Sequence, residues 1–239
     1  MSKSIAVFGA GPAMGRSVAH RYAKEGYTIV AVARRAEPLD ALVAELREAG
    51  GTAHAIAADL ALIDALPALV ERIRAYVGDP DVIYYGATAG GFISVTDLSP
   101  ERAAALMPLG IYAPIALAQA FLPAMLERGD GAILNTQGAS ALRGMPRISG
   151  GLVLAAQRNY LQALHAAVAE KGVYVGSLYV GAAIERSAYY ARQQADRAAG
   201  IPVPEMPHVD PDYLADLLWT MHNTRDRAEV TYPDRLLTP

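Results

Sequence analysis

The 239-residue chain contains no cysteine, and this absence excludes disulfides, thiol nucleophiles and thiolate metal sites. Its histidines make no metal-ligand spacing with nearby acidic residues, so we expect no metal centre. Ser140 and Ser149 have no recognisable His-Asp partners, which argues against a serine hydrolase. Internal repeats, linkers and low-complexity blocks are also missing. A chain of this length is therefore expected to form one domain, 1–239, around a large core.

Strong charge is lacking as well. The formal net charge of −3 gives no footprint of nucleic-acid binding. The N-terminus runs from Lys3 straight into an apolar strand, which is a poor signal peptide. Residues 103–126 carry no charge and are long enough to cross a membrane, but prolines, a glycine and Gln119 interrupt them. A helix buried against a sheet and a neighbouring subunit is the better interpretation. We expect a cytoplasmic protein without membrane or nucleic-acid partners.

Apolar, β-branched runs alternate with helical patterns along most of the chain. Strands are expected near 5–8, 28–34, 52–58, 82–85, 132–136, 173–180 and 228–232. Helices are expected near 14–25, 38–49, 63–77, 100–128, 149–171 and 211–223. Continuous apolar strands separated by helices indicate a parallel sheet covered on both faces. The sequence therefore predicts an α/β fold, a single Rossmann-type doubly wound sheet.

The least regular stretch is 182–210, which contains three prolines after a tyrosine pair. In a doubly wound sheet this stretch falls beside the carboxyl ends of the strands, where ligands bind. A substrate lid and an ordinary irregular loop are both open interpretations.

The first predicted strand-to-helix turn is rich in glycine and reads Gly9-Ala10-Gly11-Pro12-Ala13-Met14-Gly15. Glycines let a backbone turn sharply and approach a pyrophosphate, whose charge the N-terminus of the next helix favours. Read as G-x-G-x-x-G, the run has Gly9 and Gly11 but Met14 in the last place. Read as G-x-x-x-G-x-G, it has Gly9 and Gly15 but Ala13 in the middle. A tight turn without a ligand is the alternative, but the position favours a dinucleotide site.

Two further strand ends carry polar signals. Arg34 and Arg35 follow the second strand, where an acidic residue would bind a ribose 2′-hydroxyl. Arginines suit a 2′-phosphate instead, because their planar guanidinium groups match its geometry. The sequence thus favours NADP(H), with solvated arginines as the alternative. Asp59 and Leu60 follow the third strand, where the acid could equally cap the following turn.

With these features placed, the chain resembles the short-chain dehydrogenase/reductase family along nearly its whole length. The resemblance rests on the glycine loop, on Arg34, on Asp59-Leu60, on Phe121-Leu122-Pro123-Ala124-Met125 and on Gly131-Ala132-Ile133-Leu134-Asn135. It implies a small-molecule carbonyl or alcohol substrate, NADP(H), and a homodimer or homotetramer paired through the long helices. The cofactor contacts that it implies lie at Gly9, Gly11, Ala13, Met14, Gly15, Arg34, Arg35, Asp59, Leu60, Gly86, Ala87 and Gly181.

The family's catalytic residues do not carry over. Members of the family use an Asn, a Ser, a Tyr and a Lys around the nicotinamide. In this chain the Ser, Tyr and Lys positions hold Gly138, Gly151 and Ala155. The Asn position falls at Pro108 or Gly110, depending on register. Loss of a positioned general acid usually costs about 10²–10⁴ in rate, so the standard redox mechanism is not expected.

Three other side chains are candidate proton donors near the nicotinamide end: Tyr85, Gln137 and Tyr112. For each, the alternative is a packing aromatic or a satisfied amide. Three functions therefore remain open. The first is an atypical oxidoreductase with a relocated donor. The second is a catalytically silent cofactor-binding sensor or oligomer partner. The third is a non-redox isomerase or cyclase that uses the same pocket.

Overall fold

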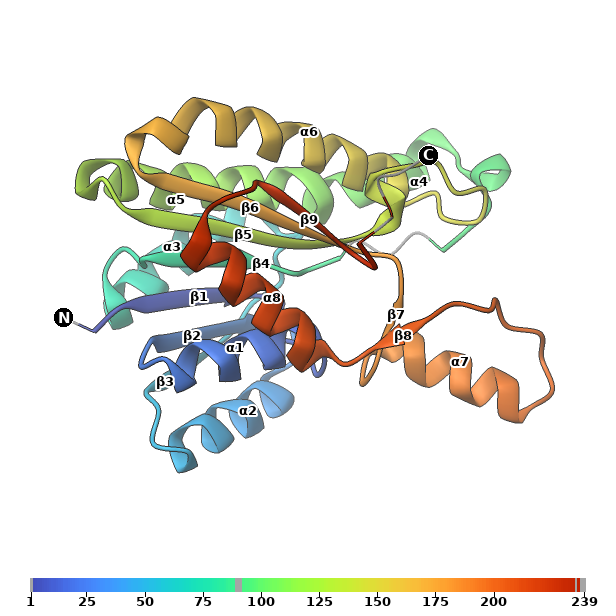
Figure 1. Cartoon of the computed structure of the whole chain (residues 1–239), viewed down its shortest axis with the longest axis horizontal. Coiled ribbons are helices and arrows are strands. Elements are labelled where there is room, and N and C mark those ends of the chain that lie inside the picture. The colour runs from blue at the N-terminus through green and yellow to red at the C-terminus, as the bar shows by residue number, and fades with distance from the viewer. Residues whose placement is uncertain (1, 89–91, 235, 237–239) are drawn as a thin grey trace.

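A computed structural model of the protein describes residues 2–88, 92–234 and 236. Its main sheet has seven parallel strands in the order β3-β2-β1-β4-β5-β6-β9 (Figure 1). The strands are β1 Ser4–Phe8, β2 Thr28–Ala33, β3 Ala53–Ala57, β4 Val82–Tyr85, β5 Gly131–Gly138, β6 Val173–Val180 and β9 Glu229–Tyr232. The predicted doubly wound parallel sheet is confirmed, with each predicted strand in its place.

Helices cover both faces of this sheet (Figure 1). One face packs against α1 Met14–Lys24, α2 Ala36–Glu48 and α8 Pro211–Thr224. The other packs against α3 Leu66–Val77, α5 Ala113–Arg128 and α6 Gly151–Val168. Successive strand residues point to opposite faces, so Ile5 and Val7 enter the first core while Ala6 and Phe8 enter the second. Both faces are apolar, as the continuous apolar strands predicted.

The long uncharged helix is not regular throughout. It divides into α4 Pro100–Met107, a π-helical turn Pro108–Tyr112, and α5. Prolines lack the N–H that the α-helical ladder needs; Pro108 is the first residue of this turn and Pro114 follows it. By length and composition Pro100–Arg128 is apolar enough to cross a membrane, with mean hydropathy 1.6. Its inner face nevertheless packs on the sheet through residues such as Phe121 and Met125, and only a third of its most apolar window is buried.

The segment 182–210 is more ordered than predicted. It contains a helix, α7 Ala188–Ala198, between two short strands, β7 Ala183–Ile184 and β8 His208–Val209, which pair in parallel. This helix was not predicted from the sequence, because its apolar residues are only alanines and tyrosines and Gln193 is its one buried residue. We call residues 185–207, between the two short strands, the arm. Figure 1 shows α7 standing beyond the carboxyl edge of the main sheet.

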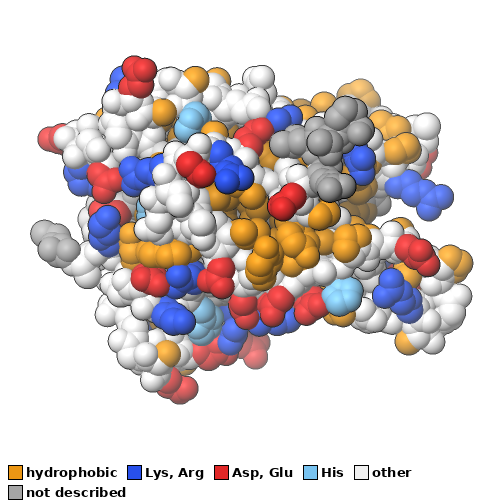
Figure 2. Space-filling view, in the orientation of Figure 1, with side chains coloured by type: hydrophobic (Ala, Val, Ile, Leu, Met, Phe, Trp, Pro, Cys, Tyr) orange, Lys and Arg blue, Asp and Glu red, His pale blue; other side chains and the backbone are white. Residues whose placement is uncertain are grey.

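The surface seen in Figure 2 mixes lysine, arginine, aspartate and glutamate side chains around a central apolar patch. Tyr213 of α8 is among the exposed apolar residues, and its ring lies 5.7 Å from that of Tyr232 on β9. Both charge signs are interspersed on this face, which agrees with the small net charge.

An aromatic cluster joins α1 to α8. The Tyr22 ring lies 5.1 Å from those of Tyr27 and Trp219, and its hydroxyl is 3.0 Å from His222 Nδ1. Burial lowers the pKa of His222 from 6.5 to about 4, because the charged imidazolium would lose its hydration. The positive charge of Arg225 lowers this pKa further.

We expect the free energy of unfolding to fall as the pH decreases from about 6.5 to about 4. In this window the unfolded chain protonates His222 and the folded chain does not, which costs the folded state up to about 3 kcal/mol. Urea unfolding across the window measures the effect. His222→Gln, which can still accept from Tyr22, should flatten the slope. Equal slopes in the wild type and His222→Gln would contradict this assignment.

Candidate functional site

The glycine loop after β1 is held by contacts between backbones. Gly9 has φ +93°, and a Cβ there would lie 2.7 Å from the Ala87 nitrogen. A Cβ on Gly15 would overlap the Gly9 carbonyl oxygen and lie 2.7 Å from the Ala10 Cα. Both positions therefore require glycine for the fold itself. The structure supports the spacing that pairs Gly9 with Gly15 and places Ala13 at the start of α1.

Gly11 differs from these two glycines. A Cβ built on it meets no atom nearer than the Gly9 oxygen at 4.0 Å. Protein packing thus gives no reason for a glycine here, whereas close approach of a ligand would. Ala13 caps α1 without a side-chain hydrogen bond. Among the described residues, no hydrogen bond is made by the backbone N–H groups of Ala13, Met14 and Gly15. Free N–H groups at a helix N-terminus make an anion site.

Arg34 and Arg35 follow β2, whose end holds the glycine loop. The N–H groups of Gly9 and Ala10 both donate to the Val32 oxygen, at 2.9 and 3.0 Å, which fixes the loop against the end of β2. Both arginines are exposed immediately after β2, and neither forms an ion pair or hydrogen bond with any described residue. Two free guanidinium groups next to free N–H groups suit a ligand with phosphates at both places.

Asp59 follows β3 and accepts a hydrogen bond from the Ala61 N–H at 3.0 Å, so the capping interpretation describes its present contact. Leu60 is buried in the core under the sheet. Asp59 also borders a hollow of about 260 Å³, lined mainly by alanine and leucine side chains, with Leu62 and Arg72 among its walls. Its second carboxylate oxygen accepts no hydrogen bond from the residues that the structure describes.

Two more predicted contacts lie at the carboxyl ends of strands. The Gly86 N–H donates to the Phe8 oxygen at 2.9 Å, and Gly86 and Ala87 pack directly on Gly9. The Gly181 N–H donates to the Tyr232 oxygen at 2.7 Å, and a Cβ on Gly181 would lie 2.7 Å from the Leu236 side chain. The fold therefore brings the segments after β1, β2 and β4 together, with Gly181 at the end of β6.

At the positions where the family resemblance predicts catalytic side chains, the free space for a side chain differs. A Cβ on Gly138 would meet only Ser140 Oγ, at 3.7 Å, and Ala155 is exposed. A Cβ on Gly151 would lie 2.9 Å from the Ser140 carbonyl oxygen and 3.2 Å from its Cβ. The start of α6 therefore lies directly against the Ser140 backbone. A larger side chain at Gly151 would require the backbone at Ser140 to move.

The surroundings of the two tyrosine candidates, Tyr85 and Tyr112, differ from those expected of a proton donor near the nicotinamide. Tyr85 is 4% exposed, lies in the core under α5 and donates its hydroxyl hydrogen to the Leu109 carbonyl oxygen at 2.5 Å. Burial raises the pKa of Tyr85, because a phenolate there would lose its hydration. Tyr112 is 51% exposed at the end of the π-helical turn. These placements favour a structural role for Tyr85 and a surface role for Tyr112.

Gln137 is buried and donates to Gln157 of α6, which is also buried. Gln137 Oε1 and Gln157 Nε2 have no partner among the described residues. Asn135, two residues earlier on the same face of β5, donates to the Tyr85 oxygen at 2.9 Å. Gln157 and Asn135 were not among the predicted site residues, although polar residues inside apolar elements were a signal that could have identified them.

The chain is similar in sequence to known proteins. The short chain dehydrogenase family matches residues 3–187. A fatty acyl-CoA reductase of Mycobacterium tuberculosis is 35% identical over 136 residues, which are 56% of this chain and 46% of the mycobacterial protein. An uncharacterised oxidoreductase of Myxococcus xanthus is 26% identical over 99% of this chain and 90% of its own length.

Solved structures share the whole fold. A short-chain dehydrogenase from Sphingobium yanoikuyae in complex with NADPH has a TM-score of 0.82 and 26% identity, covering 97% of this chain and 88% of the other. A variant of actinorhodin polyketide ketoreductase with NADPH has a TM-score of 0.87 and 22% identity, covering 100% and 98% of the two chains. The second likeness concerns the fold alone.

We expect Tyr85→Phe to lower the free energy of unfolding by about 1–2 kcal/mol, because it leaves the partly buried Leu109 carbonyl without its donor. If Tyr85 is structural, the affinity for nucleotide stays unchanged. Chemical denaturation and a nucleotide titration of the same preparation measure both quantities. Tyr76→Phe is the matched control, since Tyr76 is 51% exposed. Unchanged stability together with altered nucleotide chemistry would return Tyr85 to the list of donors.

Proposed function

The chain belongs to the short-chain dehydrogenase family, an oxidoreductase family, and from this membership we propose that it binds NADP(H) across the carboxyl ends of β1, β2 and β4. The pyrophosphate lies on the free N–H groups of Ala13, Met14 and Gly15. The 2′-phosphate lies between Arg34 and Arg35. A small molecule occupies the remaining space beside the nicotinamide.

One observation carries this proposal. Free backbone N–H groups at the start of α1 and two arginines after β2, without partners among the described residues, occur at neighbouring strand ends. Backbone donors suit a pyrophosphate, and guanidinium groups match a terminal phosphate in two parallel hydrogen bonds. Gly11 adds support, since the fold leaves open space where its side chain would stand. Solved relatives of the same fold hold NADP or NADPH.

For the chemistry, we propose that the cofactor is held without rapid hydride transfer. When bound, NADPH supplies a hydride, but a carbonyl reduction also needs a proton. Tyr85 donates to Leu109, Tyr112 is at the surface and Gln137 donates to Gln157. Two of the three candidate donors are thus engaged within the protein, and the third faces solvent. A sensor of the NADPH level, or a silent partner in an oligomer, fits these contacts best.

A slow oxidoreductase is the second candidate. Curated relatives carry reductase or oxidoreductase names, and the Mycobacterium tuberculosis relative is named for fatty acyl-CoA reduction. In this alternative, water in the open space at Gly138 and Ala155 supplies the proton. Loss of a positioned acid lowers a rate by about 10²–10⁴ without abolishing the reaction.

We also propose a cytoplasmic homodimer or homotetramer that pairs through the long helices. Only 33% of the most apolar window of Pro100–Arg128 is buried within one chain. Tyr112 and, on α6, Leu152 are exposed, at 51% and 48%. A second copy on this surface would cover apolar area that a single chain leaves in water.

Arg34→Asp should weaken NADPH binding by at least about 10-fold and leave NADH binding unchanged or improved, because it removes a guanidinium and adds a repelling carboxylate. Fluorescence titration with both nucleotides measures the ratio of affinities. Lys24→Asp makes the same change of charge at an exposed position at the far end of α1. An equal loss of NADPH affinity in both variants would show that only the overall electrostatic field of the protein has changed, and would contradict a direct contact at Arg34.

Titration with NADPH followed by turnover against a broad carbonyl panel tests the chemistry. We expect tight binding and oxidation of NADPH at most about 10⁻² of a typical enzymatic rate, since no positioned acid is available. Steady oxidation by one carbonyl at ordinary rates would establish the oxidoreductase and overturn the silent role. Absence of NADPH binding would overturn the proposal as a whole.

A further inference from the structure

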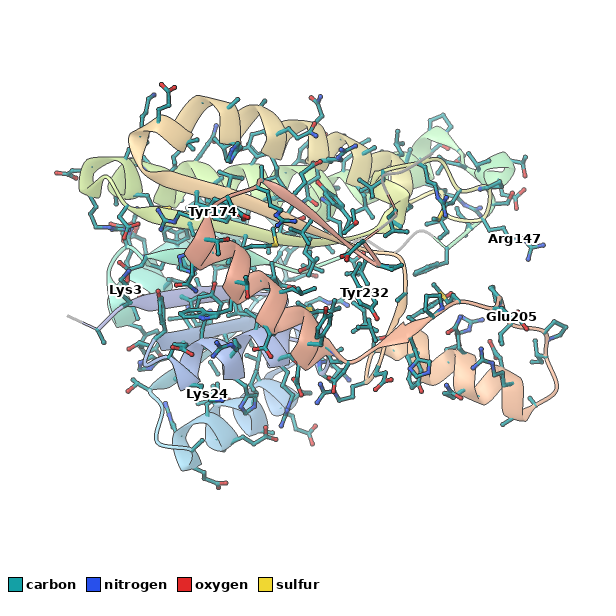
Figure 3. The ribbon with its side chains drawn as sticks, viewed as in Figure 1. Lys3, Lys24, Arg147, Tyr174, Glu205 and Tyr232 are labelled. Atoms are coloured by element: carbon teal, nitrogen blue, oxygen red, sulfur yellow. The ribbon has the colours of Figure 1, made fainter. Side chains whose placement is uncertain are left out.

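The two edge strands of the main sheet differ in sequence. Strand β9 forms one edge, where Figure 3 labels Tyr232, and it contains Glu229 and is followed by Pro233. Charged residues and prolines at an edge hinder its pairing with a strand of another chain. Strand β3 forms the other edge and reads Ala-His-Ala-Ile-Ala, with no proline, lysine, arginine or acidic residue. Its own sequence therefore gives β3 none of this protection.

The backbone of β3 presents hydrogen-bonding groups to solvent at every second residue. The ladder to β2 begins where the Ile29 N–H donates to the Thr52 oxygen at 2.9 Å, and it continues in register to the end of β3. In a parallel pair, successive residues bond alternately to one side and to the other. The N–H and C=O groups of Ala53, Ala55 and Ala57 thus point away from the sheet. We call these outward groups the β3 edge.

Two arginines bond to this edge. Arg47 donates from Nε at 3.0 Å and from Nη2 at 2.7 Å to the Ala53 carbonyl oxygen. Arg72 donates from Nη1 to the Ala57 oxygen at 3.4 Å. Neither arginine pairs with an acidic side chain in the part of the chain that the structure describes. Of the three outward carbonyls, only that of Ala55 accepts no hydrogen bond from the described residues.

The two arginines reach the β3 edge from opposite faces of the sheet. Arg47 lies in the last turn of α2, which packs on one face through residues such as Leu46. Arg72 belongs to α3, which packs on the other face. The His54 ring of β3 stacks on Tyr76, one turn beyond Arg72, with centroids 4.2 Å apart and an interplanar angle of 18°. Both helices are thereby held beside β3, and each supplies one arginine to its edge.

From these contacts we propose that the β3 edge is a self-pairing surface that Arg47 and Arg72 keep closed. The partner that fits this edge is the same edge of a second copy of the chain. Two copies related by a two-fold axis bring one strand against itself in antiparallel orientation. Pairing centred on Ala55 places the Ala53 of each copy opposite the Ala57 of the other. This inference concerns assembly and goes beyond the proposed function.

The arginines oppose this pairing in two ways. Their guanidinium groups occupy two of the three carbonyls that a second strand would need. In the antiparallel arrangement, Arg47 of each copy also meets Arg72 of the other, because the residues that they bond to lie opposite each other. Like charges directly opposite across two strands are destabilising. The repulsion occurs at both ends of the paired segment, since the axis relates them.

The double variant Arg47→Ala with Arg72→Ala tests the proposal. We expect its self-association constant to exceed that of the wild type at least about 10-fold, because two edge carbonyls and their surroundings become free. Sedimentation velocity over a range of protein concentrations measures the constant. Arg192→Ala with Arg197→Ala, which also removes two exposed arginines, is the matched control on α7. More negative charge on this acidic chain opposes association, so the control is expected to associate no more than the wild type.

Adding Ala55→Pro to the double variant identifies the surface. A proline at this position removes an N–H that points outward and leaves the ladder to β2 intact. We expect association to return to the wild-type level. Association that persists with the proline runs through another surface and overturns the proposal. Equal association of the wild type and the double variant, with both folded by circular dichroism, overturns it as well.

A charge exchange tests the same pairing without shortening the side chains to alanine. Arg47→Glu alone brings opposite charges together at both ends, so we expect association that weakens as salt is added. Arg47→Glu with Arg72→Glu again brings like charges together and should stay at the wild-type level. Equal association of the single and the double exchange overturns the antiparallel pairing. Titration of the wild type with NADPH tests the proposed function separately, so either proposal can fail alone.

Discussion

The contact between Gly15 and the Gly9 carbonyl is the constraint on which the binding end of the molecule depends. No side chain fits at Gly15, so α1 starts directly against the end of β1. The same loop is fixed to β2 by two hydrogen bonds to Val32 and to the segment after β4 by the contact with Ala87. Three strand ends are thereby joined by backbone atoms alone. These contacts hold the first turn of α1, with its free N–H groups, in one position relative to the strand ends.

The region where the family's catalytic residues are expected differs from the glycine loop in its polar contacts. Where a catalytic tyrosine is expected, Gly151 packs on the Ser140 backbone. Nearby polar groups bond inward: Tyr85 to Leu109, and Gln137 to Gln157. Free N–H groups thus gather at the start of α1, whereas Tyr85 and Gln137 hydrogen-bond within the protein, with Gln137 Oε1 and Gln157 Nε2 left without partners among the described residues. This division shows why membership of an oxidoreductase family does not by itself establish a reaction for one of its members.

Helix α1 contacts both the arm and α8. Its first turn carries Ser17, which contacts Arg186 of the arm, and its later turns pack on α8 through Tyr22 and His222. The arm, the anion site and α8 therefore share one support.

The sequence alone determined the sheet, because apolar β-branched runs and their spacing are local properties that repeat along the chain. It also predicted an anion site at the glycine-rich turn after the first strand, from the position of that turn in the chain. Tertiary structure alone decided which glycines the fold requires, because the distances from Gly15 to Gly9 and from Gly9 to Ala87 join separate elements. It alone showed that the Tyr85 hydroxyl bonds to Leu109, 24 residues away, and that Phe92 meets Tyr189. Contacts of this kind depend on how elements pack in space, and no periodicity in the chain encodes them.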